Sequence, residues 1–327
     1  MKALKYLSLV CAYLLSVHSV FSQTTYLTEK QGAYSYNSSL NSRGTEYVTF
    51  GNNAKTLSDY FYGNIPVMNI NKGFDLAVSL TGYADDNYKV HKWNYGLRGE
   101  LNFDFQLFLK DANGEGKWKV EPPHWSLEIN NTEMGGHGGM LNEGGEGSIL
   151  GQVFMVFPLV KELAPGVRYY DCEARTCGEV VVFNPDRPDY WLPVTVREIV
   201  DAKLKYYKEN DRMIYDFIKP LIEKMSVTEL NSPAFYGSDD AILNVNGIGD
   251  GLQLMRFNPE YWDRTLPVSA IQLLTFVYFG YGYNCFNEED QKNADEEYFK
   301  NNGHINYSSE ITKSINFKKL AGFFQNR

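Results

Sequence analysis

The segment LRGELNFDFQLFLKD, residues 97–111, constrains the fold of this chain of 327 residues more than any other. From Leu101 to Leu109 every second residue is apolar, and most of the residues between them are polar. A period of two is typical of a β-strand that buries one face and leaves the other in polar surroundings. The segment therefore predicts a long strand in a sheet with one apolar face.

Neighbouring segments predict antiparallel partners for this strand. The turn-forming sequence DANGEG (111–116) leads into a returning strand at 117–130, which Pro122 and Pro123 interrupt. Residues 23–70 are polar, and we expect the first part of them to trail as a linker. Further extended segments are predicted at 73–83, 148–160 and 178–185.

Helical periodicity begins after Leu192. Thr195 and Glu198 form the capping-box pattern T-x-x-E, and apolar residues then recur at helical spacing to about residue 226. Pro220 should bend or interrupt this stretch, because proline lacks a backbone donor and crowds the preceding turn. We predict a long kinked helix or a helical hairpin at about 196–226. With the strands, this gives an α+β fold with a β-rich, antiparallel N-terminal part and a mixed C-terminal part.

Two segments of the chain repeat one another, FNPDRPDYWLPVTVRE (183–198) and FNPEYWDRTLPVSAIQ (257–272). Both contain FNP, a Tyr-Trp pair and a closing L-P-V-[T/S]-x-x-[E/Q]. They indicate either a duplicated unit or the same type of turn used twice. Two copies are fewer than the three or more repeats expected of a solenoid. We interpret Trp191 and Trp262 as structural anchors. The stretch 270–283 after the second copy fits a strand or a helix.

The first 22 residues have the pattern of a signal peptide. Lys2 and Lys5 precede an apolar run, and Val20 and Ser22 stand at the spacing that signal peptidase accepts, so cleavage is expected before Gln23. A membrane anchor is the alternative, but the run is short and no basic stop follows it. We expect an exported, periplasmic or extracellular protein without an integral membrane span.

Beyond the signal peptide, 1–22, the chain divides into two regions by pattern. Residues 23–182 are β-rich, and residues 183–327 form an α+β region that contains both copies of the repeat. About 300 residues suffice for one large core or two ordinary ones. The alternative is therefore one continuous domain that the repeat joins together.

The charge balance excludes two classes of partner. Lys and Arg number 31 against 40 Asp and Glu, a net charge of −9, and loss of Lys2 and Lys5 makes it 29 against 40, or −11. The sequence has no cluster of basic residues, which binding to nucleic acid or to anionic lipid requires. Glycan and protein remain as the expected partners.

Three cysteines follow the signal peptide. Cys172 and Cys177 bracket a tight turn between extended segments, and in an oxidising compartment they predict a local disulfide. A redox pair and a metal site are the alternatives. Cys285 is then left over for burial or for an intermolecular bond, so self-association through Cys285 or through exposed edge strands is a further hypothesis.

The glycine-rich stretch NTEMGGHGGMLNEGGEG (131–147) is the candidate metal site. On an alternating strand, His124 and Glu128 share one face, and the glycine loop could fold His137 back beside them with Glu133 or Glu143 near. Two imidazoles and a carboxylate with an open position suit catalytic zinc. The alternative is a solvated connection between strands. No cofactor is required by the sequence; calcium at 111–122 is a second hypothesis, weakened by Pro122 at the place of the bidentate glutamate.

Motifs for nucleotide binding or serine hydrolysis are missing from the sequence. A pair of carboxylates could still support hydrolysis, with Glu128, Glu133 and Asp104 as candidates. Candidate binding residues are Trp93, Trp118 and Trp125, whose rings could stack on sugars. The histidines after the signal peptide are His91, His124, His137 and His304.

These patterns favour an exported, non-catalytic binding protein or a structural protein of the cell envelope that contacts glycan or protein. The alternative is a secreted hydrolase, either metal-assisted through His124 and His137 or driven by a carboxylate pair. A hydrolase needs a concave site where titratable groups converge. A binding protein needs apolar or aromatic side chains presented on a rigid surface.

Overall fold

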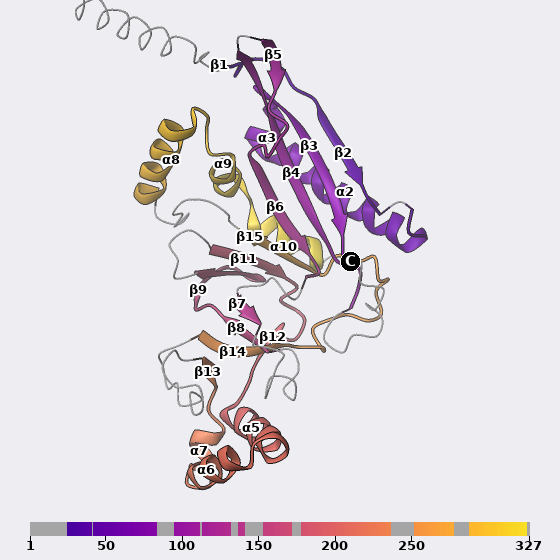
Figure 1. Ribbon diagram of the computed structural model, residues 1–327. Helices are drawn as coiled ribbons and strands as arrows, with labels where there is room; N and C mark the ends of the chain where they lie inside the picture. Colours follow the sequence, from indigo (N-terminus) through magenta and orange to yellow (C-terminus); the bar gives the residue numbers. More distant parts are fainter. Residues whose placement is uncertain are drawn as a thin grey trace, which may run out of the picture.

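The chain has an α+β fold, as predicted, in which two sheets and two groups of helices form an elongated molecule (Figure 1). This computed structural model describes residues 25–40, 42–83, 95–111, 113–131, 137–140, 153–171, 178–236, 252–277 and 288–325. Predicted features at Trp93, Glu133, Cys172, Cys177 and Cys285, and the signal peptide, lie outside these residues.

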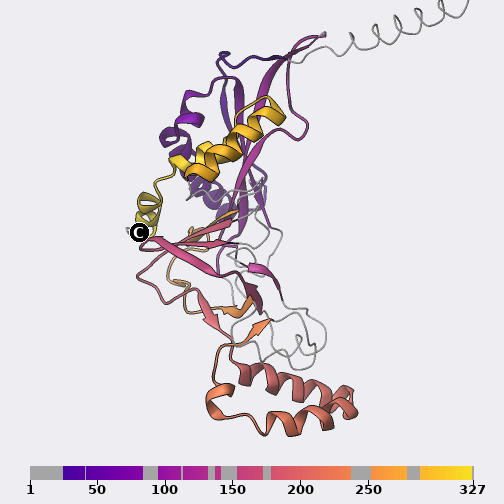
Figure 2. The ribbon, with the colours of Figure 1, turned by 90° about the vertical axis from the view of Figure 1, so that its left-hand side faces the viewer.

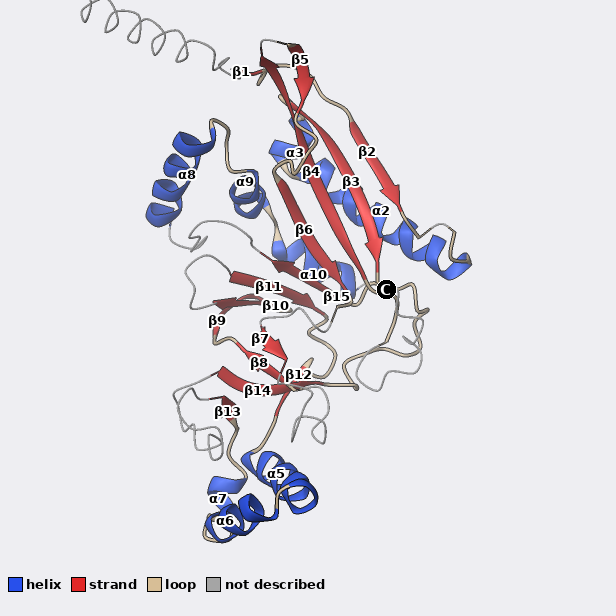
Figure 3. Ribbon diagram, viewed as in Figure 1, coloured by secondary structure: helices blue, strands red, loops and turns tan. Residues whose placement is uncertain are grey.

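The larger sheet is predominantly antiparallel and contains the predicted long strand (Figure 3). Its order is β2 (Tyr34–Ser38), β3 (Phe74–Gly82), β4 (Gly99–Asp111), β6 (His124–Ile129), β15 (Leu273–Val277), β11 (Gly178–Phe183), β10 (Val167–Asp171) and β9 (Leu159–Ala164); β1 (Thr25–Tyr26) and β5 (Gly114–Lys117) also pair with β4. Residues 273–277 of the stretch after the second copy of the repeat are thus a strand, and residues 278–283 lie outside the described residues. Segments before and after the repeat lie side by side in this sheet.

The smaller sheet lies next to the larger one, toward the far end of the molecule from β1 and β5 (Figure 1). It consists of β12 (Trp191–Pro193), β14 (Leu252–Phe257), β8 (Phe154–Val156) and β7 (His137–Met140), and β13 (Phe235–Tyr236) also pairs with β14.

The prediction of a trailing linker early in residues 23–70 is wrong. β1 and β2 begin the fold, and α2 (Thr45–Asn64) and α3 (Pro66–Ile70) follow. β2 and β3 pair in parallel, and α2 and α3 form the crossover connection that such a pair needs. The buried face of α2 is Tyr47, Phe50, Gly51, Ala54, Leu57, Ser58 and Phe61. Three of these seven residues are small, namely Gly51, Ala54 and Ser58. Large apolar residues therefore mark the buried face of α2 only in part, and their spacing alone does not reveal the helix.

One face of the large sheet carries the main core. Leu101, Phe103, Phe105 and Leu107 alternate inward on β4 and are buried, as the period of two predicts. Phe61 of α2 packs across this face. The C-terminal helices α9 (Tyr307–Ser314) and α10 (Phe317–Gln325) contribute to the same core, and α8 (Glu288–Asn302) precedes them (Figure 2).

The predicted helical region is a hairpin of two helices, α5 (Val196–Asn210) and α6 (Arg212–Ile222), followed by the short α7 (Val227–Leu230). The capping box is present, with Thr195 and Glu198 bonding each other's backbone. The chain turns at Asp211, whose side chain caps α6, and α6 continues through Pro220. Ile199 near the start of α5 and Ile222 at the end of α6 share one core cluster, so the two helices run antiparallel (Figure 2).

The turn at 111–116 is a hairpin, and calcium binding there stays a prediction. The Asp111 carboxylate accepts a hydrogen bond from the backbone N–H of Asn113 at 2.7 Å, and Glu115 pairs with Lys30 at 2.9 Å. β4 and β5 are hydrogen-bonded on either side of the turn. Among the described helices, none is long and apolar enough to cross a membrane.

Candidate functional site

The two copies of the repeat form the same turn. The Asn184 side-chain oxygen accepts from the backbone N–H of Asp186 at 3.0 Å, and the Asn258 oxygen accepts from that of Glu260 at 3.0 Å. An asparagine that bonds the backbone two residues on forms an Asx turn, and the intervening proline has a fixed φ that suits it. The shared FNP[D/E] is therefore a turn signal in both copies.

Each copy also pairs with a strand that flanks the other. β11, before the first copy, pairs with β15 after the second, with Phe183 opposite Leu273. β14, before the second copy, pairs with β12 inside the first, with Trp191 opposite Phe257. The chain of each copy runs between the two sheets, from β11 to β12 in the first copy and from β14 to β15 in the second. The repeat is thus a joint within the structure.

The aromatic residues of both copies pack into one cluster, which we call the aromatic junction: Phe183, Tyr190, Trp191, Phe257, Tyr261 and Trp262. All six are buried. Ring centroids of Phe257 and Trp262 lie 5.3 Å apart in a stacked pair, and those of Tyr190 and Tyr261 lie 6.0 Å apart edge to face. The prediction that Trp191 and Trp262 are structural anchors is confirmed.

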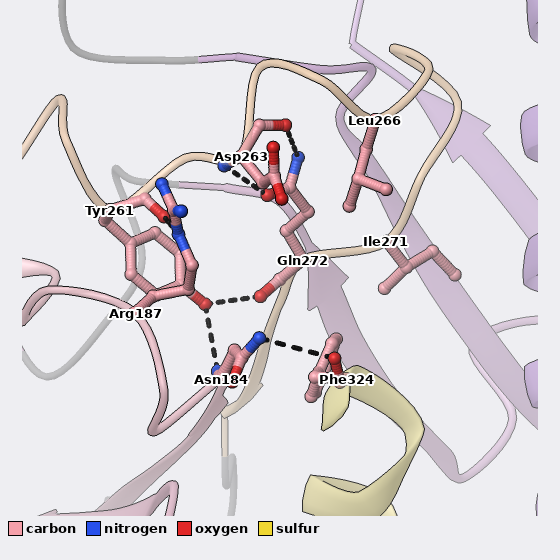
Figure 4. A pocket seen from close by; sticks show the side chains of 8 residues that line it. All are labelled: Asn184, Arg187, Tyr261, Asp263, Leu266, Ile271, Gln272 and Phe324. Atoms are coloured by element: carbon pink, nitrogen blue, oxygen red, sulfur yellow. Dashed lines mark hydrogen bonds between the residues drawn. The ribbon is translucent and has the colours of Figure 1, made fainter. Parts of the chain in front are cut away.

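Polar groups surround Tyr261 at one edge of the aromatic junction (Figure 4). The Arg187 guanidinium donates to the backbone carbonyls of Glu260, Tyr261 and Trp262 at 2.8, 2.8 and 2.9 Å. The Tyr261 hydroxyl donates to the carbonyl of Gln272. The hollow that remains here has a volume of about 40 Å³, which is room for very little beyond a water molecule. Among the described residues, the hollow beside Tyr261 is thus too small for a ligand.

A second group of aromatic residues remains open, at the other end of the large sheet. It surrounds a pocket of about 560 Å³, within the range of small-molecule sites. The pocket lies where β1, α3 and the adjoining ends of β3 and β4 meet α8 and α9. Its aromatic walls are Tyr26, Phe74, Phe299, His304 and Tyr307, and its aliphatic walls are Val67, Ile70, Leu107 and Ile305. We call it the His304 pocket.

His304 is the centre of the aromatic wall. Its ring centroid lies 5.6 Å from Tyr26, 5.8 Å from Trp118, 5.5 Å from Tyr298 and 5.9 Å from Tyr307. Burial lowers the pKa of His304, opposed by its hydrogen bond with the carbonyl of Ile305 at 3.0 Å. The imidazole therefore favours its neutral form and acts as one more ring of the wall.

Backbone geometry brings this wall together at Gly303, whose φ is +72°. A side chain is strained in that left-handed conformation, and a Cβ there would lie 3.2 Å from the Tyr26 ring. Glycine thus lets the end of α8 turn sharply and places His304 against Tyr26. Below them, Tyr307 stacks on Phe105 with centroids 4.4 Å apart, which ties the wall to the main core.

The lining of the His304 pocket is mainly apolar. Its cation, Lys72, forms an ion pair with Glu29 at 3.0 Å. The remaining polar lining is Thr25, Thr28 and His304. Ile70, Phe299 and Ile305 are exposed at the rim, although residues of this kind are normally buried. Such a surface gains free energy by covering an apolar group.

Glu128, a sequence candidate for catalysis, lies on the polar face of the large sheet. It stands opposite Glu100 on β4 and Thr275 on β15. The Tyr83 hydroxyl donates to both of its carboxylate oxygens, at 2.8 and 2.9 Å, and the Asn131 amide donates at 3.3 Å.

Burial raises the pKa of Glu128 to about 7. The hydrogen bond from Tyr83 opposes this rise and the charge of Glu100 adds to it. On the same face, burial raises the pKa of Asp104, and His124 directly opposite lowers it. A carboxyl that titrates near neutrality can act as a general acid. Glu128 is nearly fully buried, however, and both its oxygens have donors within the protein.

The two candidate zinc ligands belong to different sheets. His124 begins β6 of the large sheet, whereas His137 begins β7 of the small one, opposite Val156. Among the described residues, no group of three or more His, Cys, Asp and Glu side chains could hold a metal ion. The His137 side chain, Glu133 and Glu143 lie outside them, so the zinc site stays a prediction.

The tryptophans predicted as binding residues lie in different parts of the structure. Trp125 is buried, and its ring packs against Phe61 and Phe103 with centroids 5.3 and 5.0 Å away, so it belongs to the core. Trp118 is half-buried and contacts His304 behind the pocket wall. Trp93 lies outside the described residues. Sequence reasoning thus found one neighbour of the pocket and missed the walls.

The missed residues are Tyr26, Phe74, Phe299 and Tyr307. They come from segments far apart in the chain, so no local spacing connects them. The available signals were His304, one of few histidines, and the apolar residues that accompany it in HINY (304–307).

The hairpin of β10 and β11 bears on the predicted disulfide. Asp171 pairs with Gly178, so the connection between the two strands contains Cys172 and Cys177. The cysteines themselves lie outside the described residues, and their bond stays a prediction.

Comparison with known proteins leaves the site to be interpreted on its own geometry. No family model, curated protein or solved structure matches the chain.

Proposed function

We propose that the protein is a non-catalytic binding protein whose His304 pocket receives an apolar group of a protein or peptide partner. The observation that carries this proposal is the pocket itself, about 560 Å³ in volume, with aromatic walls and exposed apolar residues at the rim. An aromatic or branched aliphatic side chain would cover Ile70, Phe299 and Ile305 and remove apolar surface from water.

The lining favours a protein over a glycan. Sugar sites combine a stacking ring with several side chains that bond hydroxyl groups, whereas the charged lining residue here, Lys72, is already paired with Glu29. An anchor side chain in a desolvated pocket is the arrangement from which protein interfaces draw most of their affinity. Of the polar groups in the walls, the Nδ1 atom of His304 is engaged by the Ile305 carbonyl at 3.0 Å.

Binding is tested with anilinonaphthalene sulfonate, a fluorescent apolar probe, and with a library of random peptides. Val67→Trp should fill the pocket and abolish binding of both, while Val120→Trp, at an exposed position after β5, should leave binding intact. Thermal unfolding of each variant shows that it folds. Peptides with an apolar anchor that bind the wild type but not Val67→Trp support the proposal. Binding of glycans instead, or of neither class, would overturn it.

A carboxylate-driven hydrolase is the second candidate, favoured by the raised pKa of Glu128 beside Glu100. A carboxyl whose pKa is raised by burial can serve as a general acid beside a second carboxyl group. The burial of Glu128 and the donors on its oxygens weigh against it. Hydrolysis of a glycoside panel that disappears in Glu128→Gln, with binding in the His304 pocket unchanged, would promote this candidate.

We further propose that the protein acts outside the cytoplasm. The support is the charged start, the apolar run and the small residues at Val20 and Ser22. N-terminal sequencing of the protein recovered from the native cell should give Gln23 as the first residue. A chain that begins at Met1 would contradict export by this signal.

A further inference from the structure

His304 is a buried polar side chain in the wall of the His304 pocket. It is 6% exposed, and the rings of Tyr26, Trp118, Tyr298 and Tyr307 surround it, three of them edge to face and that of Tyr307 stacked. Enclosing a polar ring in this way is costly unless its nitrogens have hydrogen-bond partners. The partner of each imidazole nitrogen therefore bears on what the pocket binds.

The hydrogen bond of Nδ1 defines the tautomer of His304. Nδ1 lies 3.0 Å from the carbonyl oxygen of Ile305. A carbonyl oxygen can only accept a hydrogen bond, so Nδ1 must carry a proton. Burial also lowers the pKa of His304, which favours the neutral ring. In a neutral imidazole with its proton on Nδ1, the second nitrogen, Nε2, is a hydrogen-bond acceptor.

Nε2 has no donor within the described part of the chain. The hydrogen bond with Ile305 is the one that the His304 side chain makes there. Nε2 is not sealed from its surroundings either, because the described polar side-chain atoms that are buried without a partner belong to Asn71, Trp125 and Thr312. The open space that His304 lines is the pocket. The imidazole thus presents an unused acceptor to the pocket.

We propose that the His304 pocket recognises an indole group, the side chain of a tryptophan in the partner, whose N–H donates to Nε2 of His304. This inference rests on the binding function proposed above and specifies its anchor. Indole has a large apolar ring system, one N–H donor and no acceptor, so it complements aromatic walls that carry one free acceptor. The volume of about 560 Å³ is ample for a group of this size.

The same acceptor ranks the other anchors. Phenylalanine or leucine would cover the walls but displace water from Nε2 without replacing its hydrogen bond, which should weaken binding about fivefold or more. Tyrosine can donate through its hydroxyl but buries less apolar surface than tryptophan, so it should rank second. A lysine or arginine donor would bring a charge into mainly apolar surroundings, which costs more than one hydrogen bond returns.

Two probes of the same shape test the hydrogen bond. They are 3-methylindole and 3-methylbenzothiophene, in which sulfur replaces the N–H. Methyl NMR titration at Val67 and Ile70, which line the pocket, gives the Kd of each probe for the mature chain and for His304→Phe. This variant keeps a ring in the wall and removes both nitrogens. Thermal unfolding shows that it folds.

The expected result is a difference between two ratios, which cancels the unequal hydrophobicity of the probes. The Kd of 3-methylbenzothiophene divided by that of 3-methylindole should be about fivefold or more higher in the wild type than in His304→Phe. Equal ratios with both probes bound would overturn the indole inference alone. If neither probe binds the wild type, the pocket is not a binding site, and the function proposed above fails with it.

Nitrogen-15 NMR of the histidine side chains tests the same contact in the unaltered chain. Free His304 should show the tautomer with the proton on Nδ1, and 3-methylindole should shift its Nε2 resonance as that atom accepts a hydrogen bond. The benzothiophene should shift it much less, since it has no donor. A proton on Nε2 in the free protein, or equal shifts with the two probes, would overturn the inference.

Discussion

The molecule contains two clusters of aromatic side chains that differ in one respect. In the aromatic junction, Arg187 and the turns at Asn184 and Asn258 cover the rings with backbone hydrogen bonds, and the remaining hollow is about 40 Å³. In the His304 pocket the rings meet at a gap of about 560 Å³, with apolar residues exposed around it. The difference shows that aromatic content alone does not mark a binding site. What marks it is apolar surface that the chain leaves uncovered.

The largest expected effect is a loss of stability on opening the closed cluster. Trp262→Ala should lower the free energy of unfolding by about 3–5 kcal/mol, because it leaves a cavity among buried rings. Trp118→Ala, beside the open cluster, should cost less than half as much, since Trp118 is only half-buried. Urea unfolding followed by circular dichroism measures both. Equal losses of unfolding free energy in the two variants would contradict the view that the aromatic junction is closely packed and the His304 pocket is open.

Glu128 lies in a third kind of environment, which is buried like the aromatic junction but polar. Its pKa is raised from 4.5 to about 7, so the folded state holds this proton more tightly than the unfolded state. The contribution to stability is present below pH 4.5, declines as pH rises to about 7, and stays low above that. The loss amounts to up to about 3 kcal/mol.

Glu128→Gln removes this titration. The stability of the variant relative to the wild type should therefore increase between about pH 4 and about pH 8, by up to about 3 kcal/mol. Unfolding curves in urea at the two pH values measure the change. The groups that face Glu128 are Tyr83, Arg98, Glu100 and Asn131, all of which are retained. A difference that does not vary with pH would show that Glu128 titrates normally.

The turns that close the aromatic junction should have intermediate effects. Asn258→Ala should cost about 1–3 kcal/mol, because Asn258 is buried and its amide also donates to the carbonyl of Asp189 at 2.7 Å. Asn184→Ala should cost about 1 kcal/mol, since its second hydrogen bond, to the carbonyl of Phe324, is long at 3.3 Å. Thermal unfolding ranks the two. A larger loss of stability for Asn184→Ala than for Asn258→Ala would show that burial of the asparagine does not determine how much each turn stabilises the fold.

The smallest effect on stability is expected at the rim of the open pocket. Phe299→Ala should change the free energy of unfolding by less than about 0.5 kcal/mol, because the ring is exposed. It should nevertheless weaken binding of the apolar probe several-fold. Leu159→Ala, at an equally exposed position on β9, is the matched control for binding. Equal probe affinity in both variants would separate Phe299 from the site.

The sequence predicted those parts of the fold that depend on local pattern. The alternation on β4, the capping box at Thr195 and the FNP turns each act over a few residues, and each is present. α2 was missed because Gly51, Ala54 and Ser58 stand in its buried stripe, where close approach to the sheet favours small side chains. Hydrophobic periodicity registers large residues and underestimates such a helix.

The candidate site was predicted poorly for a different reason. The walls of the His304 pocket come from residues 25–28, 67–74, 107 and 299–307. The pairing of β1 and β3 with β4, which places Phe74 opposite Leu107, and the packing of α9 beside α3 bring these segments together. Glu128, in contrast, was found as a polar residue within an apolar alternation, which is a local signal.

The most direct test of the open pocket is a methyl NMR titration of the protein with anilinonaphthalene sulfonate. The account predicts chemical shift changes concentrated at the methyl groups of Val67, Ile70 and Ile305, with those of Val181 and Leu273 beside the aromatic junction unchanged. Changes centred on Val181 and Leu273, or no saturable change at Ile70 and Ile305, would contradict it.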